Sequence, residues 1–177
     1  MQRKEKILTT QKIIDMKTLD YININENNAN AVVNSLNQLL ADFQVHYTNL
    51  RGIHWHIQGR GFFILHEKFE SLYDGMAAKI DEVAERILML GGVPENRFSE
   101  YLKVAKLPEA TGITCGDGAV KHVLDSYKYL IALEKEALKV AEEAHDVVTA
   151  DMLTGYIAEQ EKMVWMLVAF STHNCNK

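Results

Sequence analysis

Two long helical segments separated by a pair of glycines constrain the fold of this chain more than any other feature. In residues 27–57 apolar side chains recur at steps of three and four, the spacing that gathers them on one face of an α-helix. A second stripe of this kind runs through residues 62–90, and Gly59 and Gly61 interrupt the pattern between the two. The spacing therefore predicts two long antiparallel helices joined by a tight turn.

The remainder of the chain repeats this arrangement. Residues 91–118 contain both prolines and five of the ten glycines, which predicts a long connection, with a short helical piece near residues 99–105. Helical periodicity returns in residues 119–144 and again in residues 149–171, and no segment shows sustained β-strand alternation. The chain thus has two helix pairs joined by one long connection, which carries a short helix between the second and third long helices. This order favours an all-α, ferritin-like four-helix bundle.

Length, charge and cysteine content exclude several other classes. At 177 residues the chain has the size of one domain, and we expect a partly mobile N-terminal tail over 1–25, the bundle over 26–173 and a short tail over 174–177. No apolar run is long enough to cross a membrane, and the two cysteines form no CxxC or framework pattern. With no secretory signal in its first residues, the chain is expected in the cytoplasm. The net charge of −5 argues against nucleic-acid binding over the whole surface.

The second helix carries an additional face that contains candidate metal ligands. This stripe has no lysine or arginine and has alanines at its centre, which is typical of a face that another helix approaches closely. Gly75 and Ala78 lie beside it. At about 100° per residue, the stripe consists of His66, Glu70, Tyr73, Ala77, Asp81, Ala84 and Leu88, with Glu85 at its margin.

The spacing of these ligands predicts a site shared between two copies of the chain. His54 and His66 each lie six residues from Arg60, so an antiparallel hairpin brings them to a similar height. Asp81 lies about 22 Å further along the same helix, at 1.5 Å per residue. A second copy crossing near Gly75 would place its Asp81 and Glu85 beside the histidines, and a two-fold axis would create two such sites. Two imidazoles with carboxylates suit iron or another divalent first-row metal.

Two motifs resemble the signatures of the Dps family, the mini-ferritins named as DNA-binding proteins from starved cells. His54-Trp55-x-Ile57-x-Gly59, followed by Leu65-His66 and Glu70, is similar to the first signature of that family. The second signature is similar to the run from Ile80 to Arg86, followed by Leu90-Gly91 and Pro94. The similarity extends over about residues 25–170.

The resemblance implies a homododecameric shell, built from two-fold dimers, that oxidises Fe(II) with hydrogen peroxide and stores ferric mineral. Such a ferroxidase protects against oxidative stress and holds two irons at each inter-subunit site, with zinc as a competitor. Trp55 would be a nearby aromatic electron source, and Asp146 and Asp151 would line an acidic iron-entry pore. Carried over by position, the iron ligands would be His54, His66, Glu70, Asp81 and Glu85.

Two alternatives stay open at this point. A conventional ferritin would carry a di-iron centre inside each bundle, which needs ExxH motifs on two helices, and this chain has one, at Glu142–His145. A nucleoid-compacting protein would bind DNA through the basic tip formed by Arg3, Lys4 and Lys6, with the metal site secondary. We favour the iron-oxidising function.

Overall fold

The computed structural model describes residues 17–172, and these form four long helices and two short ones with no β-strand. The predicted all-α, ferritin-like bundle is therefore confirmed. In chain order the helices are α1 (Leu19–Ile22), α2 (Glu26–His56), α3 (Phe62–Met89), α4 (Phe98–Val104), α5 (Gly116–Glu143) and α6 (Val147–Ser171). The basic tip and the last five residues lie outside the described residues.

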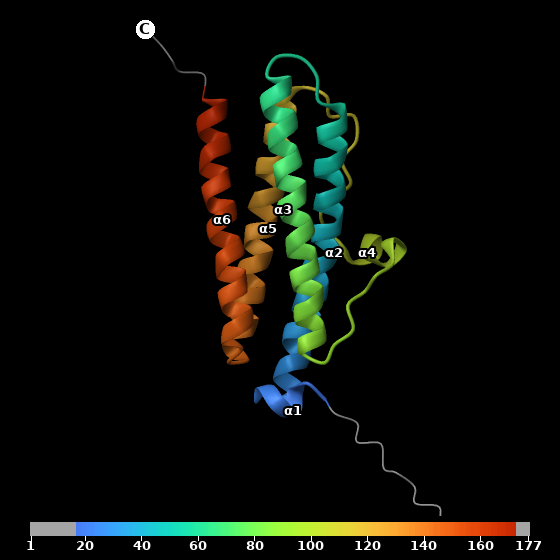
Figure 1. Ribbon diagram of the computed structural model, residues 1–177, viewed down its shortest axis with the longest axis vertical. Helices are drawn as coiled ribbons and strands as arrows, with labels where there is room; N and C mark the ends of the chain where they lie inside the picture. Colours follow the sequence, from blue (N-terminus) through green and yellow to red (C-terminus); the bar gives the residue numbers. More distant parts are fainter. Residues whose placement is uncertain (1–16, 173–177) are drawn as a thin grey trace, which may run out of the picture.

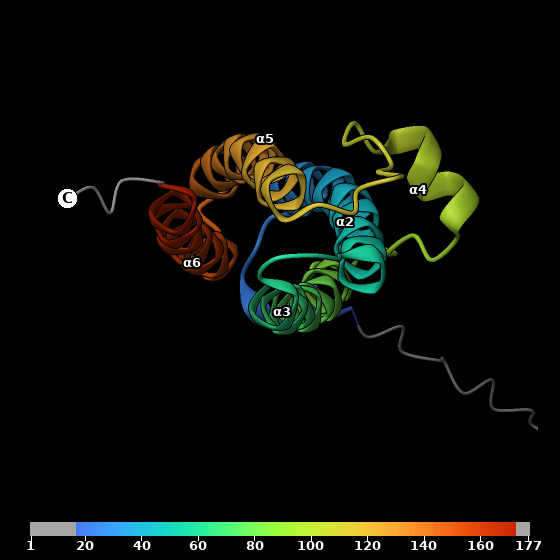
Figure 2. The ribbon, with the colours of Figure 1, turned by 90° about the horizontal axis from the view of Figure 1, so that it is seen from above.

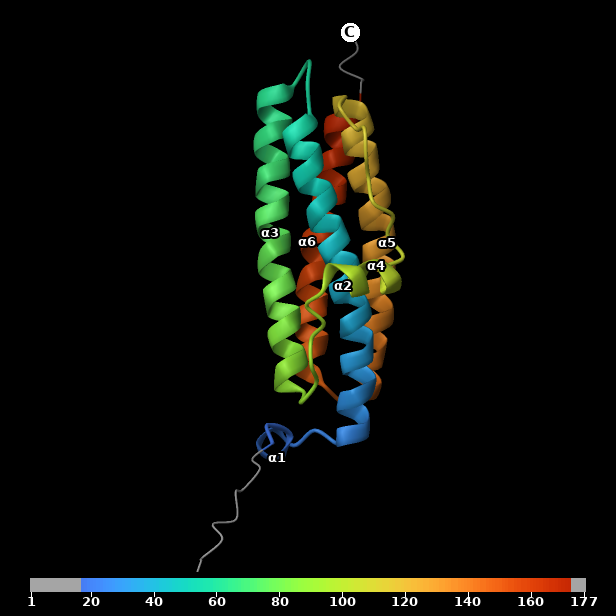
Figure 3. The ribbon, with the colours of Figure 1, turned by 90° about the vertical axis from the view of Figure 1, so that its right-hand side faces the viewer.

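The four long helices pack side by side, with α2 and α3 as one antiparallel pair and α5 and α6 as the other (Figures 1 and 2). Helix α2 packs against α3 and α5 within the bundle and against α4 on its outer side (Figure 2). The connection from α3 to α5 runs along the outside of α2 and carries α4 (Figure 3). Because this connection returns to the end of the bundle where α3 began, α5 runs parallel to α3.

Backbone chemistry explains where the first helix pair begins and turns. The side chain of Asn25 accepts a hydrogen bond from the backbone N–H of Asn27 at 2.9 Å and thereby caps the start of α2. Gly59 has a φ of 84° and Gly61 a φ of 83°, both in the left-handed region that other residues rarely adopt. These two glycines make the tight turn that directs α3 back along α2.

Two buried polar side chains on α2 attach the long connection to the bundle. The carboxylate of Asp42 accepts hydrogen bonds from the backbone N–H groups of Lys106 (2.9 Å) and Leu107 (2.8 Å). The amide of Asn49 donates to the carbonyl of Pro108 at 3.0 Å and accepts from the N–H of Ala110 at 2.9 Å. These bonds satisfy backbone groups that would otherwise lack partners where the connection crosses α2.

The structure differs from the sequence-based expectation at two places. The third long helix begins at Gly116, three residues before the predicted start at residue 119, because the glycines that suggested a loop occupy its first turn. Within the segment expected as a tail, Leu19–Ile22 forms the short helix α1, and Leu19 packs partly buried against the core near Gly91. Among the described residues, no helix has the length and apolarity needed to span a bilayer.

Candidate metal centre

His54 and His66 lie directly against each other at the turn between α2 and α3. Their rings stack with centroids 3.7 Å apart and planes 22° apart. The Nδ1 atom of His54 lies 2.9 Å from the carbonyl oxygen of His66, and the Nδ1 atom of His66 lies 2.9 Å from the carbonyl oxygen of His54. The hairpin therefore brings the two predicted histidines together, and each ring is held by the backbone of the opposite helix.

These reciprocal hydrogen bonds determine which ring nitrogen is available to a ligand. A carbonyl oxygen can only accept, so each Nδ1 must carry the proton and donate it. In a neutral imidazole the remaining nitrogen, Nε2, then holds a free lone pair. A metal-binding histidine is commonly fixed by a backbone carbonyl in this way. The donor chemistry of the pair thus fits a divalent transition metal ion.

Aromatic side chains enclose the histidine pair on both sides. The ring of Phe62 stacks on His66 with centroids 4.9 Å apart, and Tyr73 meets His54 edge-on at 5.3 Å. His54 is 8% exposed, whereas His66 is half-buried. Burial raises the pKa of Tyr73, and the nearby carboxylates of Glu70 and Asp74 raise it further. Tyr73 belongs to the same predicted face of α3 as His66 and Glu70, but no sequence pattern indicated that Tyr73 or Phe62 supports the imidazoles.

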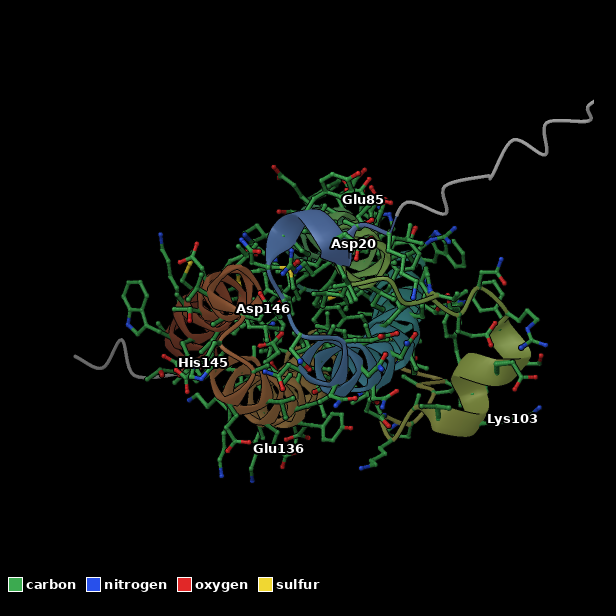
Figure 4. All side chains as sticks on the ribbon, turned by 90° about the horizontal axis from the view of Figure 1, so that it is seen from below. Asp20, Glu85, Lys103, Glu136, His145 and Asp146 are labelled. Atoms are coloured by element: carbon green, nitrogen blue, oxygen red, sulfur yellow. The ribbon has the colours of Figure 1, made fainter. Side chains whose placement is uncertain are left out.

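The three predicted carboxylate ligands lie on α3 with their side chains exposed. Glu70 follows His66 by four residues, so it lies one helical turn away on the same face. Asp81 and Glu85 are further along the helix, and Figure 4 shows Glu85 on the side of α3 that faces away from the bundle. Within residues 17–172, no three His, Cys, Asp or Glu side chains gather closely enough to hold a metal ion. One chain brings together the histidines but not the distant acidic pair.

Trp55, the predicted electron source, extends from the surface near the end of α2. Its side chain is 63% exposed, and the guanidinium of Arg51 lies over its ring at 4.8 Å from the centroid. The same guanidinium lies 5.3 Å from the ring of Tyr47. Arg51 lies one turn before Trp55 on the same helix and therefore orients the indole through a cation–π contact. Its redox role stays a prediction.

Asp146, which was predicted to line an iron-entry pore, has structural contacts within this chain. Asp146 is 1% exposed and caps the start of α6 by accepting from the N–H of Thr149 at 3.1 Å. Its Oδ1 atom also accepts from Arg86 at 2.7 Å, and its Oδ2 atom accepts from the Thr149 hydroxyl at 2.5 Å. Its role in a pore between subunits stays a prediction. Asp151 is exposed, and its pore role stays a prediction.

The chain resembles known proteins over most of its length. Residues 33–173 match the model of the ferritin-like domain. A relative from Porphyromonas gingivalis named DNA protection during starvation protein is 51% identical over 156 residues, covering 88% of this chain and 98% of the relative. DNA protection during starvation protein 2 of Bacillus anthracis is 40% identical over 139 residues, which are 78% of this chain and 95% of that protein.

Solved structures that resemble this chain are also Dps proteins. The Dps protein of Vibrio cholerae, described as a member of a broad superfamily of ferritin-like diiron-carboxylate proteins, superposes with a TM-score of 0.82 at 42% identity, covering 84% of this chain and 94% of that one. A Dps protein from Bacillus brevis superposes with a TM-score of 0.80 at 40% identity, covering 82% and 98%. The chain therefore belongs to the ferritin-like family and, within it, to the Dps proteins.

Proposed function

We propose that the protein is a ferroxidase that oxidises Fe(II) with hydrogen peroxide at sites shared between two subunits. The observation that supports this most is the fixed histidine pair, because backbone carbonyls hold both Nδ1 atoms and so leave the two Nε2 atoms for a metal ion. In the proposed site, His54, His66 and Glu70 come from one subunit. Asp81 and Glu85 come from a second copy, whose α3 crosses the first near Gly75.

Each part of the chain has a defined task in this proposal. The imidazoles and carboxylates bind Fe(II), and the aromatic rings of Phe62 and Tyr73 hold the imidazoles in place. Two Fe(II) ions supply the two electrons that reduce one hydrogen peroxide to two waters, with two protons consumed and two Fe(III) ions formed. Reduction by two electrons avoids releasing hydroxyl radical. The Fe(III) then leaves for storage as mineral inside a dodecameric shell, whose entry pores would include Asp151.

Subunit complementation tests the shared site. We expect peroxide consumption by Fe(II)-loaded protein to be lost in His66→Ala and in Asp81→Ala, while Glu67→Ala, an exposed acid next to His66, serves as the matched control. When the two inactive variants are dissociated, mixed and reassembled, each mixed interface holds one intact site and one doubly altered site. Random mixing makes half of the interfaces mixed, so about a quarter of the activity should return. No recovery after verified subunit exchange would refute the shared site.

DNA binding is the second candidate, favoured by the basic residues Arg3, Lys4 and Lys6 and by the name of the relatives. Contacts of this kind reach phosphates without reading bases, so they weaken steeply as salt rises. A gel-shift titration over increasing salt, repeated with residues 1–10 deleted, tests it. Binding that survives the deletion would rule out the basic tip as the contact.

A further inference from the structure

A polar pair is enclosed between α5 and α6, away from the histidine centre. Glu134 on α5 is 0% exposed and Gln160 on α6 is 2% exposed. The amide nitrogen Nε2 of Gln160 donates a hydrogen bond to Oε1 of Glu134. The other oxygen of each group, Oε2 of Glu134 and Oε1 of Gln160, is buried without a hydrogen-bond partner.

Two unpartnered acceptors in one buried pair require an explanation, since native proteins rarely leave such atoms unsatisfied. If Glu134 is ionised, Oε2 of Glu134 and Oε1 of Gln160 can both only accept, so these two atoms remain without a partner. If Glu134 carries a proton, its O–H can donate to Oε1 of Gln160 while its other oxygen continues to accept from Nε2. The terminal torsions of Glu and Gln rotate broadly, so small rotations close this ring of two hydrogen bonds.

We infer that Glu134 is a neutral carboxylic acid in the folded protein at neutral pH, paired with the amide of Gln160 through two hydrogen bonds. One proton accounts for every polar atom of the pair, and no additional component is needed. The pair thereby makes the stability of the contact between α5 and α6 depend on pH, since loss of the proton leaves a buried charge facing an acceptor.

The groups around the pair support a neutral Glu134. Burial raises its pKa to about 8, although the bond from Gln160 and the charge of Lys79 on α3 oppose this. Glu159 on α6 raises the pKa further and also holds the Lys79 ammonium in an ion pair at 2.5 Å, so that this cation is already partnered.

The other side chains nearby bring no free charge to the pair. Burial raises the pKa of Tyr127 on α5 and of Tyr156 on α6, which keeps both phenols neutral. Tyr156 donates its hydroxyl to Glu82 of α3 at 2.6 Å. From α2, the apolar ring of Phe43 lies 6.2 Å from the ring of Tyr156.

The direction of the pH effect follows from the raised pKa. In the unfolded chain Glu134 releases its proton near its ordinary pKa of 4.5, whereas the folded chain holds it until about pH 8. Between these values the unfolded state binds fewer protons, so the stability contributed by the pair is present in acid and falls as pH rises. Above about pH 8 the folded protein is itself ionised at this position, and no further loss arises from Glu134.

Glu134→Gln tests this inference, because glutamine has the shape and hydrogen-bonding capacity of the neutral acid but cannot ionise. Thermal unfolding of the assembled protein should show a midpoint that falls between pH 5 and pH 8 more steeply in the wild type than in Glu134→Gln. The matched control is Glu136→Gln, an exposed acid two residues along α5 (Figure 4), which should keep the wild-type slope. Equal slopes in wild type and Glu134→Gln, or failure of Glu134→Gln to fold, would overturn the inference.

Infrared spectroscopy of the wild type gives a second, direct readout. At pH 7 exposed carboxyls are ionised, so a carbonyl band of a neutral carboxylic acid should be present from Glu134 and should disappear as pH rises through about 8. The band should be absent from Glu134→Gln and unchanged in Glu136→Gln. A wild-type spectrum without this band at pH 7 would show that Glu134 is ionised.

Discussion

The buried ion pair between Arg86 and Asp146 should be one of the most sensitive positions in the bundle. It joins α3 to the start of α6 at 2.7 Å, and its side chains are 8% and 1% exposed. Arg86 also donates from Nε to the Thr149 hydroxyl at 2.8 Å. Replacing Asp146 with alanine would remove the cap of α6 and leave the guanidinium buried without its counter-charge.

The expected magnitude follows from these two losses. Removing one partner of a buried ion pair costs about 3–5 kcal/mol, because the remaining charge is uncompensated. Loss of a side-chain cap costs about 1 kcal/mol. We therefore expect Asp146→Ala to lower the free energy of unfolding by about 4–6 kcal/mol. The double variant Asp146→Ala/Arg86→Met carries no buried charge and should lose only about 1–2 kcal/mol, from the cap and from imperfect packing.

Denaturant unfolding followed by circular dichroism, at one fixed protein concentration, measures these differences. Asp151→Ala is the matched control, since it removes an exposed acid in the first turns of the same helix and should change stability by less than about 0.5 kcal/mol. If the single variant is no less stable than the double variant, the buried guanidinium does not need Asp146 and the reasoning is wrong.

The same carboxylate predicts an acid dependence. Burial alone would raise the pKa of Asp146, but hydrogen bonds from Arg86 and Thr149 outweigh it and hold the pKa below the ordinary 3.8. For an acid whose folded pKa is lowered, the stabilisation is present above the unfolded pKa and disappears as pH falls through the folded one. The wild type should therefore lose this contribution below about pH 4, and Asp146→Ala should not share that loss.

Three further predictions test other parts of the structure. Gly92→Ala should destabilise the fold by about 1–3 kcal/mol in denaturant unfolding, because a Cβ there would meet Val33 at 2.6 Å. Gly75→Leu, where a Cβ meets nothing within 4 Å, should fold normally but elute as a smaller species on gel filtration if a second copy crosses at this point; unchanged assembly would place the crossing elsewhere. His46→Leu should remove an acid sensitivity, because burial, aided by His122, lowers the pKa of His46 to about 3 from 6.5. Wild-type thermal stability should thus decline as pH falls between these values, and the variant should decline less.

The bundle could be predicted from sequence because its apolar stripes repeat over many turns and its breaks fall at glycines with positive φ. The histidine pair could be predicted for the same reason, since the turn at Gly59 and Gly61 fixes the relative height of the two helices. The distance from His66 to Asp81 also follows from helical rise alone. Features that depend on regular helical geometry were therefore accessible without coordinates.

Features that depend on contacts between distant segments were not accessible. Asp42 and Asn49 carry no motif, yet they hold the long connection more than fifty residues away in sequence. Asp146 has the residue type expected of a pore, but its partner Arg86 lies sixty residues away. The Glu134–Gln160 pair was also missed, because a single acid on a helix gives no sign of whether it faces solvent or the interior.

The mutual hydrogen bonds of the two histidines couple the position of each ring to the opposite helix. Each imidazole is hydrogen-bonded to a backbone carbonyl of the other helix. Sliding α2 along α3 would therefore rotate both rings together. A force applied to one ring is passed to the backbone that carries the other. A displacement at this end of the bundle is thus passed into the contact between α2 and α3, and neither ring can move independently of the other.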